Sequence, residues 1–114
     1  MAENRTREVI EYFRQRLAEK GVRIAKIIVF GSQVTGNAAP ESDIDFVVVS
    51  ADFQGKDIFD RVEMTKKAET ETIRKFMVPL DVIPLTPDEF DSESSLIATY
   101  AKKGEVIFGP PSPG

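Results

Sequence analysis

The sequence contains neither cysteine nor histidine among its 114 residues. Without cysteine, the chain cannot form a disulfide, use a thiolate nucleophile or bind zinc through sulfur. Without histidine, it has no imidazole to act as a catalytic base or a metal ligand. Any proton transfer or metal binding must therefore depend on carboxylates.

The sequence also lacks an excess of positive charge, because its 15 lysines and arginines are outnumbered by 19 acidic residues, for a net charge of −4. Nucleic-acid binding needs a positive surface field, so we expect no direct contact with nucleic acid. The sequence shows no signal peptide and no apolar run of membrane-spanning length, which predicts a soluble, cytoplasmic protein without membrane contact. The length fits a single domain.

Apolar spacing near the N-terminus predicts an amphipathic helix over about residues 3–20, ended by Gly21. Apolar runs then predict strands over about 23–30, 43–50 and 80–85, and 105–108 is expected to form a short edge strand. The valine run 47–49 indicates a strand buried on both faces. This order predicts an α+β fold of α/β-like character, with a mixed β-sheet flanked by helices.

Further helices are expected over residues 56–76 and about 92–103, the second after the start signal Thr86-Pro87. The apolar residues of the 56–76 helix are predicted to anchor it to the core: Ile58, Phe59, Val62, Ile73, Phe76 and Met77. Its charged residues are predicted to form a solvated face: Arg61, Lys66, Lys67, Arg74 and Lys75, which alternate with Glu63, Glu69 and Glu71. We expect a folded domain over 1–109 and a disordered tail over 110–114.

A Gly-Ser pair and an Asp-x-Asp pair stand between two apolar runs, with ten residues separating them. Gly31 would let a phosphate approach the backbone, and Ser32 adds a hydroxyl and an N–H donor. Asp43 and Asp45 are expected on one face of a strand, about 6 to 7 Å apart at the backbone. Two carboxylates at that distance repel each other unless a cation neutralises them, and Mg²⁺ prefers oxygen ligands.

A third carboxylate, Asp81, lies within the apolar run 80–85, where a buried, unpaired charge would be costly. A metal or a substrate hydroxyl would offset that cost, and the carboxylate could accept the proton of an attacking hydroxyl. Three carboxylates suit a site in which two Mg²⁺ ions promote in-line displacement at phosphorus. Alone, each motif has an ordinary interpretation: a turn, a strand-edge cap, or a surface aspartate paired with a lysine.

Together, Gly31-Ser32, the ten-residue gap, Asp43-Ile44-Asp45 and the later strand aspartate Asp81 resemble the signature of the DNA polymerase β-type nucleotidyltransferase superfamily. The N-terminal helix, the strand around residues 80–83 and the closing segment 104–108 make the chain most similar to the minimal nucleotidyltransferases. The resemblance covers nearly all of the chain.

This resemblance implies that Asp43, Asp45 and Asp81 are catalytic residues that bind Mg²⁺, and that Asp81 also acts as the base. It implies that Gly31 and Ser32 hold the triphosphate of ATP. Members of that family often act as antitoxins of HEPN-domain ribonuclease toxins, and they transfer AMP from ATP to a toxin tyrosine. The resemblance therefore implies a protein adenylyltransferase with a HEPN-domain toxin as partner.

The sequence departs from the family pattern after the serine. Many relatives carry an arginine there, whereas Gln33, Val34 and Thr35 follow in this chain. Glutamine cannot reproduce the bidentate, charge-assisted contact of arginine with phosphate, so a lysine or arginine from the second helix or from a partner would have to replace it.

Two other functions remain open at this point. The first is a non-catalytic antitoxin with a vestigial site, and the second is an aminoglycoside-type adenylyltransferase that modifies a small molecule. A domain of this size has no additional helical domain for its acceptor. The acceptor surface is therefore expected to come from a partner or from a second copy in a homo-oligomer.

Overall fold

The computed structural model describes residues 4–30, 43–92 and 104–109. Its elements are α1 (Asn4–Glu19), β1 (Lys26–Phe30), β2 (Ile44–Val49), η1 (Ala51–Phe53), α3 (Ile58–Phe76), β3 (Leu80–Leu85), α4 (Pro87–Asp91) and β4 (Glu105–Phe108). The bounds of α1, α3 and the four strands agree with the predicted elements to within a few residues, whereas η1 was not predicted and α4 lies before the expected helix at its Thr86-Pro87 start signal. The helix expected over 92–103 and the tail 110–114 lie outside the described residues, apart from Ser92. No helix in the described ranges is both long and apolar enough to cross a membrane.

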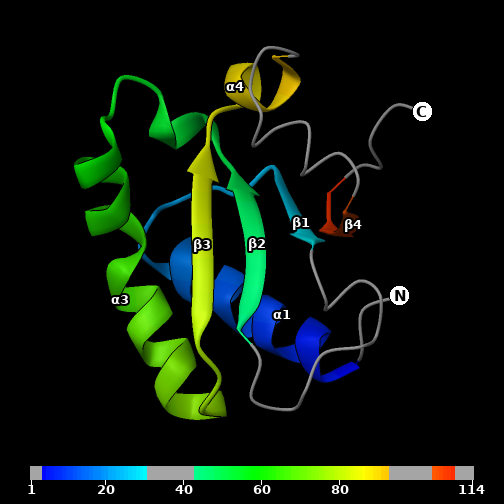
Figure 1. Cartoon of the computed structure of the whole chain (residues 1–114). Helices are drawn as coiled ribbons and strands as arrows, with labels where there is room; N and C mark the ends of the chain where they lie inside the picture. The colour runs from blue at the N-terminus through cyan, green and yellow to red at the C-terminus, as the bar shows by residue number, and fades with distance from the viewer. Residues whose placement is uncertain (1–3, 31–42, 93–103, 110–114) are drawn as a thin grey trace.

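The four strands form one sheet in the order β3-β2-β1-β4. β1 is antiparallel to β2 and to β4, whereas β2 and β3 are parallel. Figure 1 shows α1 crossing one face of this sheet while α3 runs along its β3 edge. The predicted α+β fold with a mixed sheet is therefore confirmed, and so is the prediction that residues 105–108 form an edge strand.

Side chains of β2 alternate between two apolar clusters, one on each face of the sheet. Phe46 packs toward α1, where its ring centroid lies 5.2 Å from that of Phe13. Val47 points to the opposite face and joins the cluster that contains Phe90 of α4. β2 is thus buried on both faces, as its valine run predicted. Asp45 has the same parity as Val47, so it faces away from α1.

Two glycines occupy positions that other residues could not take without strain. Gly21 has a φ of 86° two residues after the end of α1, as its predicted role in ending that helix requires. Gly104 lies so close to β1 that a Cβ atom there would be 2.4 Å from the carbonyl oxygen of Val29. Glycine at this position therefore permits the chain entering β4 to approach β1.

The buried face of α3 differs from the prediction. Its fully buried residues are Thr65, Ala68 and Thr72. Five of the six predicted anchors are exposed instead: Ile58 (55%), Phe59 (78%), Val62 (45%), Ile73 (36%) and Met77 (79%). Threonine can replace apolar residues here because its hydroxyl is satisfied within the helix, as where Thr72 Oγ1 donates to the carbonyl of Ala68 at 2.7 Å.

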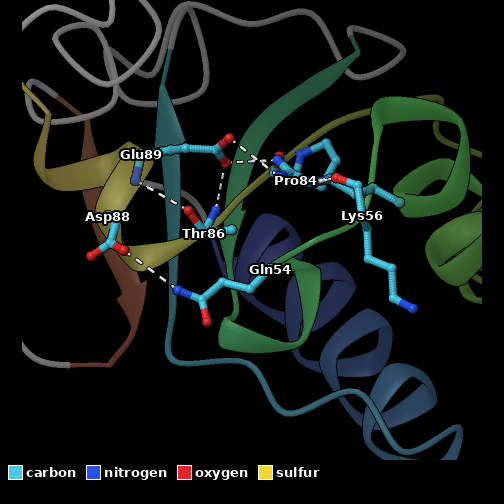
Figure 2. A network of polar contacts seen from close by, with 7 residues as sticks. Gln54, Lys56, Pro84, Thr86, Asp88 and Glu89 are labelled. Atoms are coloured by element: carbon cyan, nitrogen blue, oxygen red, sulfur yellow. Dashed lines mark hydrogen bonds and ion pairs between the residues drawn. The ribbon is translucent and has the colours of Figure 1, made fainter.

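Arg61, near the start of α3, was expected on a solvated face, but its side chain is only 12% exposed. Its Nη1 and Nη2 donate to the two carboxylate oxygens of Glu89 at 2.7 and 3.2 Å. The same guanidinium donates to the carbonyls of Pro84 and Lys56. Figure 2 shows this group of contacts together with Thr86, whose predicted role as a helix cap is confirmed by a capping box with Glu89. The network ties α3 to the end of β3 and to α4.

Candidate functional site

Asp45 and Asp81 lie side by side near the beginning of the two parallel strands. The register pairs Asp45 of β2 with Asp81 of β3, and neighbouring strands are about 4.8 Å apart. Residues paired in this way project to the same face of a sheet. Both carboxylates therefore project from the face opposite α1.

The carboxyl group of Asp45 lies in a negative environment. Burial raises its pKa above the ordinary value, the charges of Asp81 and Asp43 raise it further, and a hydrogen bond with Asp81 adds to the effect. Within the described part of the chain, no lysine or arginine forms an ion pair with Asp45 or Asp81. The local field therefore favours the binding of a cation.

Asp43 and Asp81 are both exposed. Asp43 lies directly before β2 and acts electrostatically on Asp45, in agreement with the expectation that the two aspartates are close. The expectation that Asp81 is buried is wrong, because β3 is the outermost strand of the sheet. Its exposed charge does not require a partner for folding. The register with Asp45, rather than burial, is what links Asp81 to the site.

Gly31 and Ser32 lie outside the described residues. The residue before them, Phe30, pairs with Asp45 across the antiparallel β1–β2 ladder. Phe30 also packs against the cluster on the face from which Asp45 projects. The strand that precedes the Gly-Ser pair therefore ends beside the carboxylates.

A fourth carboxylate, Glu69 of α3, belongs to this group, although the alternating charges of α3 predict a solvated face for it. Burial raises the pKa of Glu69 to about 7, and the negative charge of Asp81 contributes to this rise. In the described ranges its carboxylate has no hydrogen-bond or ion-pair partner. Its spacing of four residues from Thr65 and three from Thr72 places it beside the buried face of α3. Hydrophobic periodicity could not reveal that face because threonines form much of it.

The donors gathered at this edge are all carboxylate oxygens, the ligand type that Mg²⁺ prefers. Over residues 4–30, 43–92 and 104–109, however, no three acidic side chains are arranged closely enough to hold a metal ion. The chemistry of the donors fits Mg²⁺. The arrangement is a pair of aspartates with further acids nearby rather than a complete set of ligands.

The sequence matches the family described as nucleotidyltransferase domain over residues 7–104. It has no significant match among curated proteins. A similar solved structure is that of a candidate nucleotidyltransferase from Sulfolobus solfataricus, with 26% identity, a TM-score of 0.52, and coverage of 76% of this chain and 68% of that chain.

Two further similar structures share the fold at lower identity. One is a toxin-antitoxin structure with AMP-PNP, at 19% identity and a TM-score of 0.60, covering 95% of this chain and 75% of that chain. The other is the toxin-antitoxin MntA-HepT, at 18% identity and a TM-score of 0.51, covering 84% of this chain and 67% of that chain. The family match spans most of the sequence and agrees with the mixed sheet, so the chain belongs to the nucleotidyltransferase-domain family.

Proposed function

We propose that this protein is a Mg²⁺-dependent nucleotidyltransferase that transfers AMP from ATP to a hydroxyl group of a partner protein. Membership of the nucleotidyltransferase-domain family supports a transferase. The observation that carries the metal-dependent part of the proposal is the pairing of Asp45 with Asp81, without a cation from the described residues to neutralise them. Two adjacent carboxylates repel each other in isolation, and a divalent cation that binds between them together with a triphosphate would offset this repulsion.

In the proposed site, Asp43, Asp45 and Asp81 hold Mg²⁺, while Gly31 and Ser32 hold the triphosphate. Bound Mg²⁺ would supply positive charge that stabilises in-line displacement at phosphorus. The acceptor oxygen forms a bond to the α-phosphorus as the bond to the β-phosphate oxygen breaks, and pyrophosphate leaves. Asp81 is the residue that accepts the proton of the acceptor hydroxyl.

The proposed acceptor is a tyrosine of a HEPN-domain toxin, for which this protein acts as the antitoxin in the cytoplasm. The motif resemblance of Gly31-Ser32 and Asp43-Ile44-Asp45 supports this acceptor. So does the fold shared with two proteins solved as toxin-antitoxin assemblies.

A second candidate function is that of a non-catalytic antitoxin that neutralises its toxin by covering it. The observation that favours it is the arrangement of acids in the described residues, which form no group of three around one point. The replacement of the usual arginine by Gln33, Val34 and Thr35 points the same way.

The two candidates differ in what happens to the partner protein. Incubation of a HEPN-domain toxin with this protein, ATP and Mg²⁺ is expected to add AMP to the toxin, as read by intact mass, and EDTA or Asp43→Asn should abolish the addition. Asp91→Asn, an exposed acid at the end of α4, is the matched control and should retain transfer. Transfer by Asp43→Asn would contradict the mechanism. Neutralisation of the toxin without any adduct would establish the second candidate.

A further inference from the structure

One side of α3, next to its buried face, carries a regular row of residues, which we call the α3 stripe; all of its members are exposed except Glu69, which is half-buried. It consists of six residues at intervals of four, four, three, four and four: Ile58, Val62, Lys66, Glu69 and Ile73 within α3, and Met77, which caps the C-terminus of the helix. At 3.6 residues per turn, these intervals keep the five members within α3 to about 80° of the helix circumference. The four apolar members are between 36 and 79% exposed. In Figure 1 no described element lies on the outer side of α3.

The intervals of the α3 stripe read the same from either end. Two copies of α3 laid antiparallel, with a two-fold axis between Lys66 and Glu69, would therefore match the stripe to itself. Ile58 of each copy would then face the partner's Met77. Val62 would face Ile73 of the second chain, so apolar residues would meet at both ends of the contact.

The two charged members of the stripe would also find partners in this arrangement. Within the described residues, neither the Lys66 ammonium nor the Glu69 carboxylate has an ion-pair partner, although they are only three positions apart. Among the other charged residues of α3, Arg61 pairs with Glu89, and Glu71 contacts Lys20 at 2.9 Å. Across the two-fold axis, Lys66 would face the partner's Glu69, and the reciprocal pair would form at the same time.

We propose that the α3 stripe is the docking surface for a second copy of this chain, with the two α3 helices antiparallel about a two-fold axis. α3 has 19 residues and is about 28 Å long, so an apolar row along it is longer than a small ligand could cover. A symmetric row of apolar residues with opposite charges on either side of its centre is self-complementary, which is what an isologous interface requires.

This docking has a consequence for the candidate site. Glu69 lies close enough to Asp81 for the two charges to interact. The partner's Lys66 would therefore bring a positive charge to the edge of the acidic group. The inference goes beyond the proposed transfer reaction, because the dimer would form whether or not transfer occurs.

The test is a charge exchange between two variants, Lys66→Glu and Glu69→Lys, followed by sedimentation velocity over a concentration series. The wild type is expected to approach twice its monomer mass of 12.7 kDa as concentration rises. In a homodimer of either variant, positions 66 and 69 would carry the same charge at both symmetric contacts. This repulsion should raise the dissociation constant of the dimer by about tenfold or more. An equimolar mixture of the two variants restores both opposite-charge pairs and should form a heterodimer.

The matched control is Lys67→Glu, which reverses an exposed charge on the same helix but on a side away from the stripe. This variant should dimerise like the wild type, and thermal melts by circular dichroism should show that all variants are folded. A wild type that stays monomeric, or a mixture that does not recover the dimer, would overturn the proposal. A monomeric wild type whose binding to a HEPN-domain toxin is lost in Lys66→Glu would assign the stripe to that other protein instead.

Discussion

Glu89 of α4 and Glu69 of α3 lie in opposite electrostatic environments. At one end of the sheet, hydrogen bonds from Arg61 lower the pKa of Glu89 below its ordinary value. At the other end, burial and the charge of Asp81 raise the pKa of Glu69 to about 7. Arg61 neutralises the carboxylate of Glu89, and this ion pair holds α3 against α4. The carboxylate of Glu69 adds negative charge beside Asp45 and Asp81, with which no lysine or arginine among the described residues forms an ion pair.

The carboxylate of Glu89 therefore stabilises the fold, whereas the carboxylates of Glu69 and Asp45 lower its stability. Residues kept in an unfavourable ionisation environment are frequent where a ligand or a metal supplies the missing charge. The acidic end of β2 and β3 therefore has the properties of a binding site, whereas the Arg61–Glu89 end has those of a structural contact. Substitutions at the two ends should accordingly change stability in opposite directions.

The largest effect on stability is expected for Arg61→Ala. This change removes the ion pair with Glu89 and the hydrogen bonds to the carbonyls of Pro84 and Lys56. The free energy of unfolding, measured by urea denaturation, should fall by about 2 kcal/mol. Arg74→Ala, an exposed arginine of the same helix, should change it by less than about 0.5 kcal/mol. Equal losses in both variants would show that the Arg61 contacts add nothing.

Glu69→Gln should stabilise the folded protein, and the gain should depend on pH. Because the pKa of Glu69 is raised from 4.5 to about 7, its contribution to stability is fully present below about pH 4.5 and is lost as the pH rises through 7. The variant should therefore match the wild type at pH 4. At pH 8 it should be more stable by about 1 kcal/mol, after allowance for solvent screening. A gain that is the same at both pH values would contradict this origin.

A smaller effect of the same sign is expected for Asp45→Asn. The substitution relieves the repulsion from Asp81 and Asp43, and at pH 7 it should raise the free energy of unfolding by less than about 1 kcal/mol. Addition of Mg²⁺ should reverse the order of the two proteins, since only the wild type gains stability from binding the ion. Thermal melts with Mg²⁺ and with EDTA measure both effects, and Asp91→Asn should show neither.

Most of the fold could be predicted from the sequence because its strands have simple patterns. The apolar runs 46–49 and 80–85 correctly predicted β2 and β3, and the Thr86-Pro87 signal correctly predicted the start of α4. The role of Arg61 could not be predicted, because its partner Glu89 is distant in sequence. The orientation of α3 was predicted wrongly, because its buried face contains threonine and alanine while its apolar residues are exposed.

The candidate site could be predicted in part. The spacing of Asp43 and Asp45 identified one strand of the site, and the acid in the middle of an apolar run identified Asp81. That Asp45 and Asp81 share a register depends on the parallel pairing of β2 and β3, which no local pattern encodes. Glu69 was missed because only the packing of α3 against the sheet edge brings it near Asp81. Gly31 and Ser32 remain a prediction.

The most direct test of the central claim is isothermal titration of ATP into the wild type and into Asp43→Asn, each with Mg²⁺ and with EDTA. If the acids at the start of β2 and β3 form a metal-dependent nucleotide site, ATP should bind only to the wild type and only with Mg²⁺. Binding that persists in EDTA, or that is unchanged in Asp43→Asn, would contradict the proposed role of these carboxylates. The absence of binding under all four conditions would contradict a nucleotide site formed by this chain alone.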